Sequence, residues 1–336
     1  MERVITDYSQ VSKLVETLRA CGFPSGSDRT NHASLHWKEA MLRANSYFAL
    51  VSICHQTSPL GERRLEGVVG NVKKAGWDYL KERFLEKVRQ DAEWASPEYW
   101  RVLRPADLSK LYDDPVCGKT LNRVNERAFL LNDAGDRLRK SGYHNIKEPF
   151  DGCHGFIGGE SGFLAFLKTF EAYKDPVMKK AHLFLALMEK ELGWVIRDPE
   201  HLLSPVDYHE MRGHLRMGTI LVQDPGLASK VQRGLTLTDD EDCEIRSRVQ
   251  GVNSFISHQT GISGPFIHSL FWNVFRNCCP RASGETHCSD CGRNCGLPSP
   301  YKKMDTYRNR CMFSAFCHAA GKADKVIDPP YAGHYY

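Results

Sequence analysis

The sequence has no long hydrophobic runs, and this excludes several classes of protein. No apolar stretch approaches the ~18 residues that a membrane-spanning helix needs, and the first ten residues, MERVITDYSQ, lack the basic-then-apolar pattern of a signal peptide. With 336 residues, of which 41% are hydrophobic, the chain can bury one large core or two smaller ones. We therefore expect a globular, monomeric, cytoplasmic protein with no membrane partner.

Alternating strand patterns with Asn-Gly or Asp-Gly turns are scarce, whereas apolar residues at helical spacing are frequent. This predicts an all-α fold. The expected helices cover about 8–21, 34–56, 72–90, 97–104, 118–141, 160–173, 175–192, 206–217, 239–259 and 264–277. A segment rich in Gly and Pro, 142–162, is expected to link two helical lobes. The predicted domains are an N-terminal lobe (1–150), a catalytic lobe (151–277) and a tail (278–336).

The numbers of basic and acidic residues are nearly equal, so the formal net charge is only +4. The basic excess lies in the tail, from Phe271 to Tyr336. A basic tail can follow a phosphate backbone, although a solvated surface with no partner explains it equally well. The basic residues that we expect to contact nucleic acid there are Arg281, Arg293, Lys302 and Lys303.

Cysteine, by contrast, is abundant: seven of the twelve lie between Cys278 and Cys317. Thiols stay reduced in the cytoplasm, so a dense cluster indicates metal ligation rather than disulfides. The pair Cys288-x-x-Cys291 offers two thiolates from one turn, and His287 is a further option for zinc. A structural iron–sulfur cluster or a zinc ion remain alternatives. The candidate ligands are Cys279, Cys288, Cys291, Cys295, Cys311 and Cys317.

The most informative stretch is LSPVDYHEMRGHLRMG, from Leu203 to Gly218. Ser204 followed by Pro205 is typical of a helix start, which puts Asp207 in the first turn. The helix dipole and the free backbone N–H groups there favour an ionised carboxylate. Such a carboxylate can stabilise an oxocarbenium-like sugar or orient and deprotonate a water that attacks C1′. A simple capping aspartate is the alternative.

A lysine that forms a covalent bond with a sugar must be neutral, which requires an apolar surrounding that lowers the pKa of its amine. Lys180 has this pattern, because it shares a helix face with Leu183, Phe184, Leu187 and Met188. Lys179 falls on a more polar face. The alternative is that Lys180 lies at the helix edge and extends its amine into water.

Two residues are candidates for a pocket that holds an extruded base. Gln56, at the expected C-terminal end of the helix at 34–56, offers an amide that can read a purine edge. Trp272, next to Phe271 and close to Phe275, offers a stacking surface. The alternatives are a helix-capping amide for Gln56 and a core position for Trp272.

The run Pro205-Val206-Asp207-Tyr208-His209, followed by Arg212, Arg216 and Gly218, resembles the signature of the helix-hairpin-helix DNA glycosylases. The pattern is nearest to that of archaeal 8-oxoguanine glycosylases. The resemblance implies a two-lobed helical fold with Asp207 as the catalytic residue, Lys180 as the Schiff-base lysine, and His209 and Arg212 as nucleic-acid contacts. The spacing from Cys279 to Cys295 is similar to the four-iron (4Fe-4S) cluster loop of endonuclease III-type members.

We therefore expect an N-glycosylase that removes a modified or oxidised purine from DNA, as in base-excision repair, with or without lyase activity at abasic sites. Two alternatives stay open. The first is hydrolysis of a free modified nucleotide, because the closing segment from Asp328 to Tyr336 is faintly similar to queuosine-salvage hydrolases. The second is a non-catalytic nucleic-acid-binding protein held together by metal. A role in antiphage defence is also compatible with the sequence.

Overall fold

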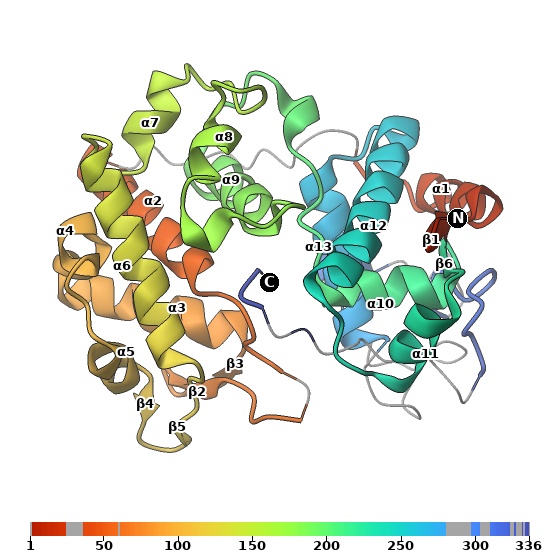
Figure 1. Cartoon of the computed structure of the whole chain (residues 1–336), viewed down its shortest axis with the longest axis horizontal. Helices are drawn as coiled ribbons and strands as arrows, with labels where there is room; N and C mark the ends of the chain where they lie inside the picture. Colours follow the sequence, from red (N-terminus) through yellow and green to blue (C-terminus); the bar gives the residue numbers. More distant parts are fainter. Residues whose placement is uncertain are drawn as a thin grey trace. The chain divides into compact units, whose positions relative to one another are not determined.

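The computed structural model describes residues 2–24, 36–59, 61–279, 297–302, 310–322, 326, 331 and 333–335. Helices dominate these residues, and the strands are short and lie in two-stranded pairs, so the expected all-α class is confirmed (Figure 1). The chain divides into two compact units: unit 1 comprises Met1–Asp28 and Leu203–Gly333, and unit 2 comprises Arg29–Leu202 and His334–Tyr336. The boundaries expected at 150 and 277 do not coincide with this division.

Unit 1 joins the beginning of the chain to its last third. Strand β1 (Val4–Thr6) pairs antiparallel with β6 (Ile220–Val222), and helix α1 packs on α12. The helices of unit 1 are α1 (Tyr8–Ala20), α10 (Tyr208–Met217), α11 (Pro225–Arg233), α12 (Asp239–Thr260) and α13 (Gly264–Asn277), with a 3-10 turn at Ser299–Tyr301.

Local sequence explains where the helices of unit 1 begin and end. Helix α12 starts with a capping box, in which Thr238 and Glu241 bond each other's backbone N–H groups. Helix α10 starts after Asp207, not at Ser204–Pro205 as expected, and it ends at Gly218 with φ +79°. Gly213 lets α10 approach α13 closely, because a Cβ there would lie 2.0 Å from the ring of Phe275.

Unit 2 holds the larger set of elements. Helix α2 (Trp37–Ser52) packs on α9 (Lys179–Leu192), α3 (Trp77–Gln90) and α6 (Val124–Lys140). Two antiparallel pairs, β2–β3 (Glu66–Val69, Val72–Ala75) and β4–β5 (Asp113–Asp114, Gly118–Lys119), lie between helices. The shorter helices are α4 (Pro97–Trp100), α5 (Pro105–Leu111), α7 (Lys147–Gly152) and α8 (Phe163–Leu167), with 3-10 turns at Ala92–Ala95, Glu171–Tyr173 and Pro199–His201.

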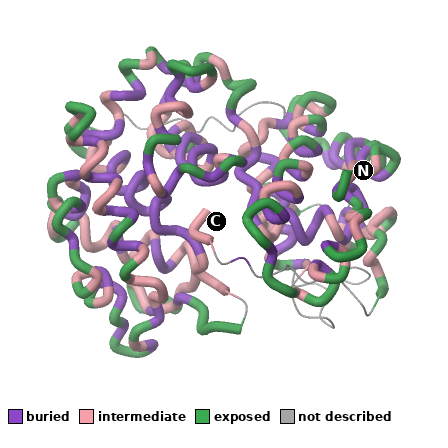
Figure 2. Tube along the Cα trace, viewed as in Figure 1, coloured by how far each residue is buried: buried purple, intermediate pink, exposed green. Residues whose placement is uncertain are grey.

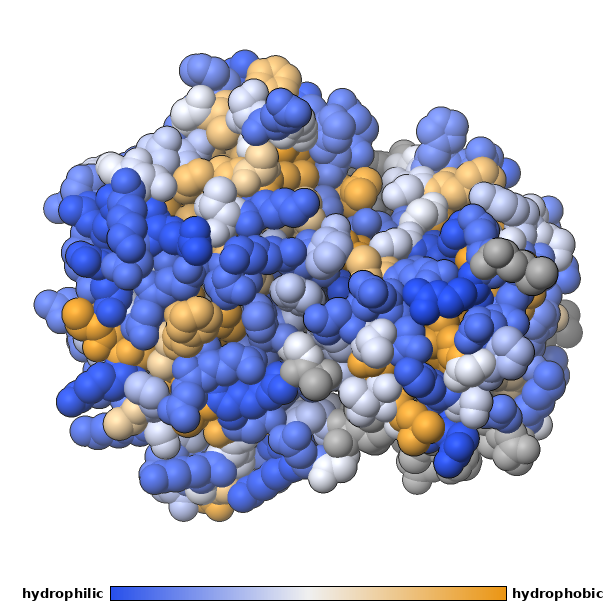
Figure 3. All heavy atoms as spheres, in the orientation of Figure 1, coloured by the Kyte–Doolittle hydropathy of each residue, from blue (hydrophilic) through white to orange (hydrophobic). Residues whose placement is uncertain are grey.

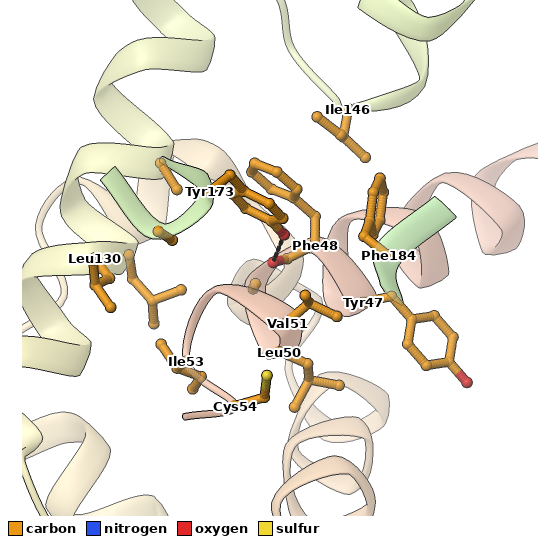
Figure 4. Packing of buried hydrophobic residues seen from close by; sticks show 14 of the residues in the cluster. Tyr47, Phe48, Leu50, Val51, Ile53, Cys54, Leu130, Ile146, Tyr173 and Phe184 are labelled. Atoms are coloured by element: carbon orange, nitrogen blue, oxygen red, sulfur yellow. Dashed lines mark hydrogen bonds between the residues drawn. The ribbon is translucent and has the colours of Figure 1, made fainter. Parts of the chain in front are cut away.

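The core of unit 2 surrounds the C-terminal half of α2, where an unbroken stretch from Ala44 to Ser52 is buried (Figure 2). The ring of Phe48 stacks on Tyr173 with 5.0 Å between the ring centres, and the Tyr173 hydroxyl donates to the Phe48 carbonyl (Figure 4). Burial of such large aromatic side chains contributes strongly to the stability of this unit. The end of α2 is therefore fixed in an apolar surrounding.

The segment expected to link two lobes, 142–162, lies entirely within unit 2. Its backbone N–H groups at Ile157 and Gly158 donate to the carboxylate of Asp198 (2.8 Å each). These bonds fix the segment to the loop that carries Asp198 in the same unit.

The face of each unit seen in Figure 3 is mostly hydrophilic, with apolar side chains in scattered groups. None of the helices in the described ranges is long and apolar enough to cross a membrane. This agrees with the absence of long hydrophobic runs in the sequence.

Candidate functional site

Asp207 lies at the N-terminal end of α10 in unit 1, with a side chain that is 6% exposed. It is the N-cap residue, and its Oδ1 accepts hydrogen bonds from the backbone N–H groups of His209 (2.8 Å) and Glu210 (3.3 Å). The carboxylate therefore faces the positive end of the helix dipole, which favours its ionised form. Capping, the alternative that the sequence left open, is a real part of its role.

Behind Asp207 lies a second carboxylate, which the sequence analysis did not single out. Glu210 is fully buried, and its Oε2 accepts from Asn253 Nδ2 (2.6 Å) of α12 and from the Ser204 hydroxyl (3.1 Å). Its Oε1 accepts from Nδ1 of His268 on α13. Ser204 thus belongs to this network rather than to a helix cap.

His214 extends the polar interior of α10 by one turn. It is fully buried, and its Nδ1 lies 2.8 Å from the hydroxyl of Thr219. Burial lowers the pKa of His214 to about 4, so the ring is neutral at neutral pH. This histidine is an internal group that supports α10.

Three half-buried side chains flank the start of α10: His209, His268 and Trp272. The ring centres of His209 and Trp272 lie 6.1 Å apart, and the Arg276 guanidinium lies 4.5 Å from the centre of the Trp272 ring. Trp272, which was expected to stack on a base, thus lies near His209, two residues after Asp207. Its ring already makes a cation–π contact with Arg276.

Arg212, expected to contact nucleic acid, is only 1% exposed. Its guanidinium donates to the carbonyls of Phe275 (2.8 Å) and Cys279 (3.0 Å) at the C-terminal end of α13, and it lies 2.9 Å from His209 Nδ1. The structure corrects the expected role, because these internal carbonyls take the donors that a phosphate would need. Arg212 joins α10 to the start of the cysteine-rich segment.

Arg216, one turn further along α10, contacts two of the cysteines expected to bind metal. The Nη1 of Arg216 donates to Cys279 Sγ (3.0 Å), and its Nε donates to the Val326 carbonyl (2.8 Å). The backbone carbonyl of Arg216 accepts from the Cys317 thiol (3.3 Å). Two thiols distant in sequence thus meet the same residue.

The described residues include only part of the expected metal centre. Within the described ranges, no group of three His, Cys, Asp or Glu side chains is arranged to hold a metal ion. Cys311 is described and half-buried, and Lys302 is exposed. The other expected ligands and basic residues lie outside the described residues: Cys288, Cys291, Cys295, Arg281, Arg293 and Lys303.

Lys180 belongs to unit 2, at the start of α9, and is fully buried. Its Nζ donates to the carbonyl of Ser52, the last residue of α2 (2.7 Å). Burial, together with the charges of Lys179 and Arg127, lowers the pKa of Lys180 to about 7. The amine does not extend into water, so the alternative of a helix-edge lysine is wrong.

Lys179, expected on a more polar face, is also buried, and its Nζ lies 3.8 Å from Cys54 Sγ. Arg127 donates to the carbonyls of Ile53 and His55 just past the end of α2, where Figure 4 places Ile53 and Cys54. Three basic side chains therefore lie at one helix end, whose carbonyls carry the negative end of the dipole.

Gln56 does not lie on a helix, because α2 ends at Ser52. Its backbone has φ +49°, in the left-handed region, so it lies in the turn that follows the helix. The expectation that a helical amide at this position reads a base is corrected.

A scan against protein-family models finds no match for this chain, and a search of curated proteins finds no significant relative. The geometry of the two charged helix ends is therefore what any functional argument must use.

Proposed function

We propose that this chain is an N-glycosylase that cleaves the N-glycosidic bond of a modified or oxidised purine in DNA, with Asp207 as the catalytic carboxylate. The observation that carries the proposal is the position of Asp207, which is nearly buried and fixed by two backbone N–H groups. The residues that donate them lead to the half-buried groups at this helix start, because His209 lies beside Trp272 and Glu210 bonds His268. A negative charge held this way stabilises the positive charge that develops on the sugar without reorganising in the transition state.

In this reaction the bond between C1′ and the base nitrogen breaks, and the electron pair leaves with the base. The sugar becomes oxocarbenium-like, and Asp207 lowers the energy of that state electrostatically. Water or an amine then bonds to C1′. Lys180 of unit 2 is the amine that the family resemblance implies for a lyase step. Its pKa of about 7 leaves a substantial neutral fraction at neutral pH, and the step also requires its buried Nζ to leave the Ser52 carbonyl.

The metal proposed for the tail has a structural role, since sites with only thiolate ligands leave no open coordination position. Arg216 supports this assignment, because its guanidinium donates to Cys279 Sγ and its backbone carbonyl accepts from the Cys317 thiol, so two of the expected ligands lie at one residue. Metal analysis of the purified chain tests it: iron with broad absorption near ~400 nm indicates a cluster, and zinc without colour indicates a zinc site.

The central test compares Asp207→Asn with Asp224→Asn. Asp224 is the N-cap of α11 in the same unit and accepts from Leu227 N (2.7 Å), so it is a matched control. We expect Asp207→Asn to lower the single-turnover rate on a duplex containing 8-oxoguanine by at least about 10²-fold, because the amide keeps the cap but loses the charge. Asp224→Asn should retain the wild-type rate. Full activity of Asp207→Asn would refute the proposal.

Two further experiments define the reaction. Borohydride should trap a covalent complex of the wild type with abasic DNA, and the Lys180→Gln variant should not form this complex. If Lys180→Gln still forms it and Lys179→Gln does not, the nucleophile is Lys179. Free 8-oxo-dGMP is the second substrate. Turnover of the nucleotide with none of the duplex would replace DNA by a nucleotide as the substrate.

A further inference from the structure

The Glu210–His268 pair has the geometry of a carboxylate–imidazole dyad. Glu210 is fully buried on α10, and the His268 side chain on α13 is 12% exposed. Nδ1 of the ring donates to Glu210 Oε1, so the proton of the neutral imidazole is placed on Nδ1 and Nε2 is the basic nitrogen. Nε2 makes no hydrogen bond to any described residue.

The dyad is rigid because other groups fix the carboxylate. Asn253 and the Ser204 hydroxyl bond the second oxygen of Glu210. This leaves Oε1 for the histidine, and Gly213 keeps α10 and α13 in close contact one turn further on. Histidines with a structural role commonly have hydrogen-bond partners at both ring nitrogens. In His268, Glu210 fixes the ring through Nδ1, and the side chain is partly exposed to solvent.

One residue connects the dyad to Asp207. The backbone N–H of Glu210 donates to Asp207 Oδ1, and the side chain of Glu210 accepts from His268. Trp272 follows His268 by one turn of α13 and lies beside His209. The same end of α10 thus carries a fixed carboxylate and an oriented base.

We propose that His268 is a second catalytic residue, the base that takes the proton from the water attacking C1′, and that Glu210 is its positioning residue. This rests on the function proposed above and deepens it. After the C1′–N bond has broken, the water oxygen bonds to C1′, the water proton moves to Nε2, and it passes from there to the departing base. Atoms and charge balance as hydrolysis, with no further reactant.

The division of roles follows from the hydrogen bonds. Asp207 Oδ1 already accepts two backbone N–H groups, which suits a carboxylate that stays ionised and stabilises the sugar. His268 gains a positive charge when it takes the proton, and the buried Glu210 carboxylate stabilises that charge as the aspartate of a catalytic triad does.

The activity test uses the full chain and the 8-oxoguanine duplex. His268→Gln keeps an N–H for Glu210 but takes up no proton, so we expect its single-turnover rate to fall about 10²- to 10⁴-fold with unchanged affinity for the duplex. His258→Gln, on the exposed side of α12, is the matched control and should be unaffected. Added imidazole should restore part of the rate to His268→Gly, a result that a purely structural role would not give.

A second test needs no turnover. Diethyl pyrocarbonate, followed by peptide mass spectrometry, should modify His268 at Nε2 and leave the fully buried His214 untouched. An unreactive His268 would show that water does not reach Nε2 and would overturn the dyad as a base.

The outcomes separate the two proposals. If Asp207→Asn is inactive and folded while His268→Gln turns over at the wild-type rate, the dyad is refuted and the glycosylase proposal stands. If Asp207→Asn is also fully active, the glycosylase proposal itself fails.

Discussion

The C-terminal end of α2 in unit 2 and the N-terminal end of α10 in unit 1 hold charges of opposite sign by the same principle. Carbonyls at the end of α2 accept from Lys180 and Arg127, and N–H groups at the start of α10 donate to Asp207. In each case the side-chain charge opposes the helix dipole. The two ends differ in what surrounds them.

At α2 the cations are completely buried, and burial lowers the pKa of Lys180 to about 7 and that of Arg127 to about 10. At α10 the fixed carboxylate is flanked by half-buried His268 and Trp272. The first end therefore resembles an interior joint between helices, and the second combines a fixed charge with groups that solvent or a ligand can reach. Variants at each end can separate these roles.

The largest expected effect is at Arg127. Its guanidinium also donates to the backbone carbonyl (2.9 Å) and side-chain oxygen (2.8 Å) of Asn122, so Arg127→Met leaves several buried acceptors without a donor. We expect the free energy of unfolding to fall by about 3–5 kcal/mol, measured by urea denaturation. Arg101→Met, which removes an exposed ion pair with Asp136, should cost less than about 1 kcal/mol. Equal losses would show that α2 does not depend on its buried cation.

The next effect depends on pH. The pKa of Lys180 is about 7 in the folded chain, against the ordinary lysine value of 10.5 in the unfolded chain, so between these pH values the unfolded chain binds more protons than the folded chain. The free energy of unfolding of the wild type therefore falls as the pH is lowered from 10.5 to 7, by roughly 1.4 kcal/mol per unit from this group alone. Below about pH 7 the contribution is constant.

Lys180→Met removes this dependence. Relative to the wild type, the variant should gain stability as the pH falls from 10 to 7, although it loses one hydrogen bond, to Ser52. Lys190→Met, at an exposed position on the same helix, provides the control. A difference between Lys180→Met and wild type that stays flat from pH 6 to 10 would contradict a buried, neutral amine.

The smallest effect concerns the cap of α10. Asp207→Ala removes both hydrogen bonds to the helix start and should lower the free energy of unfolding by about 0.5–2 kcal/mol, whereas Asp207→Asn should be nearly neutral. Thermal unfolding measures both. Asp224→Ala, at the cap of α11, should lose a similar amount. If Asp207→Asn destabilises the chain as much as Asp207→Ala, the charge rather than the cap maintains this helix end.

The sequence by itself determined the helical class and most helix positions, because apolar spacing along a helix decides which side turns inward. It placed Lys180 on an apolar helix face but left a helix-edge position open, which the structure excluded. It also placed Asp207 at a helix start, within one turn of where α10 begins. It did not reveal Glu210 as special, since a glutamate in a first turn is usually an exposed capping group.

Only the tertiary structure decided the rest. Unit 1 combines the beginning of the chain with its last third, through pairings such as that of β1 with β6, which no local pattern encodes. The sequence alone predicts Arg212 as a surface cation, but in the structure its guanidinium donates to the Phe275 carbonyl near the end of α13. The Glu210–His268 pair brings together residues 58 positions apart. Contacts of this kind depend on which helices pack together, and helix packing is set by the summed burial of many side chains rather than by the residues that meet.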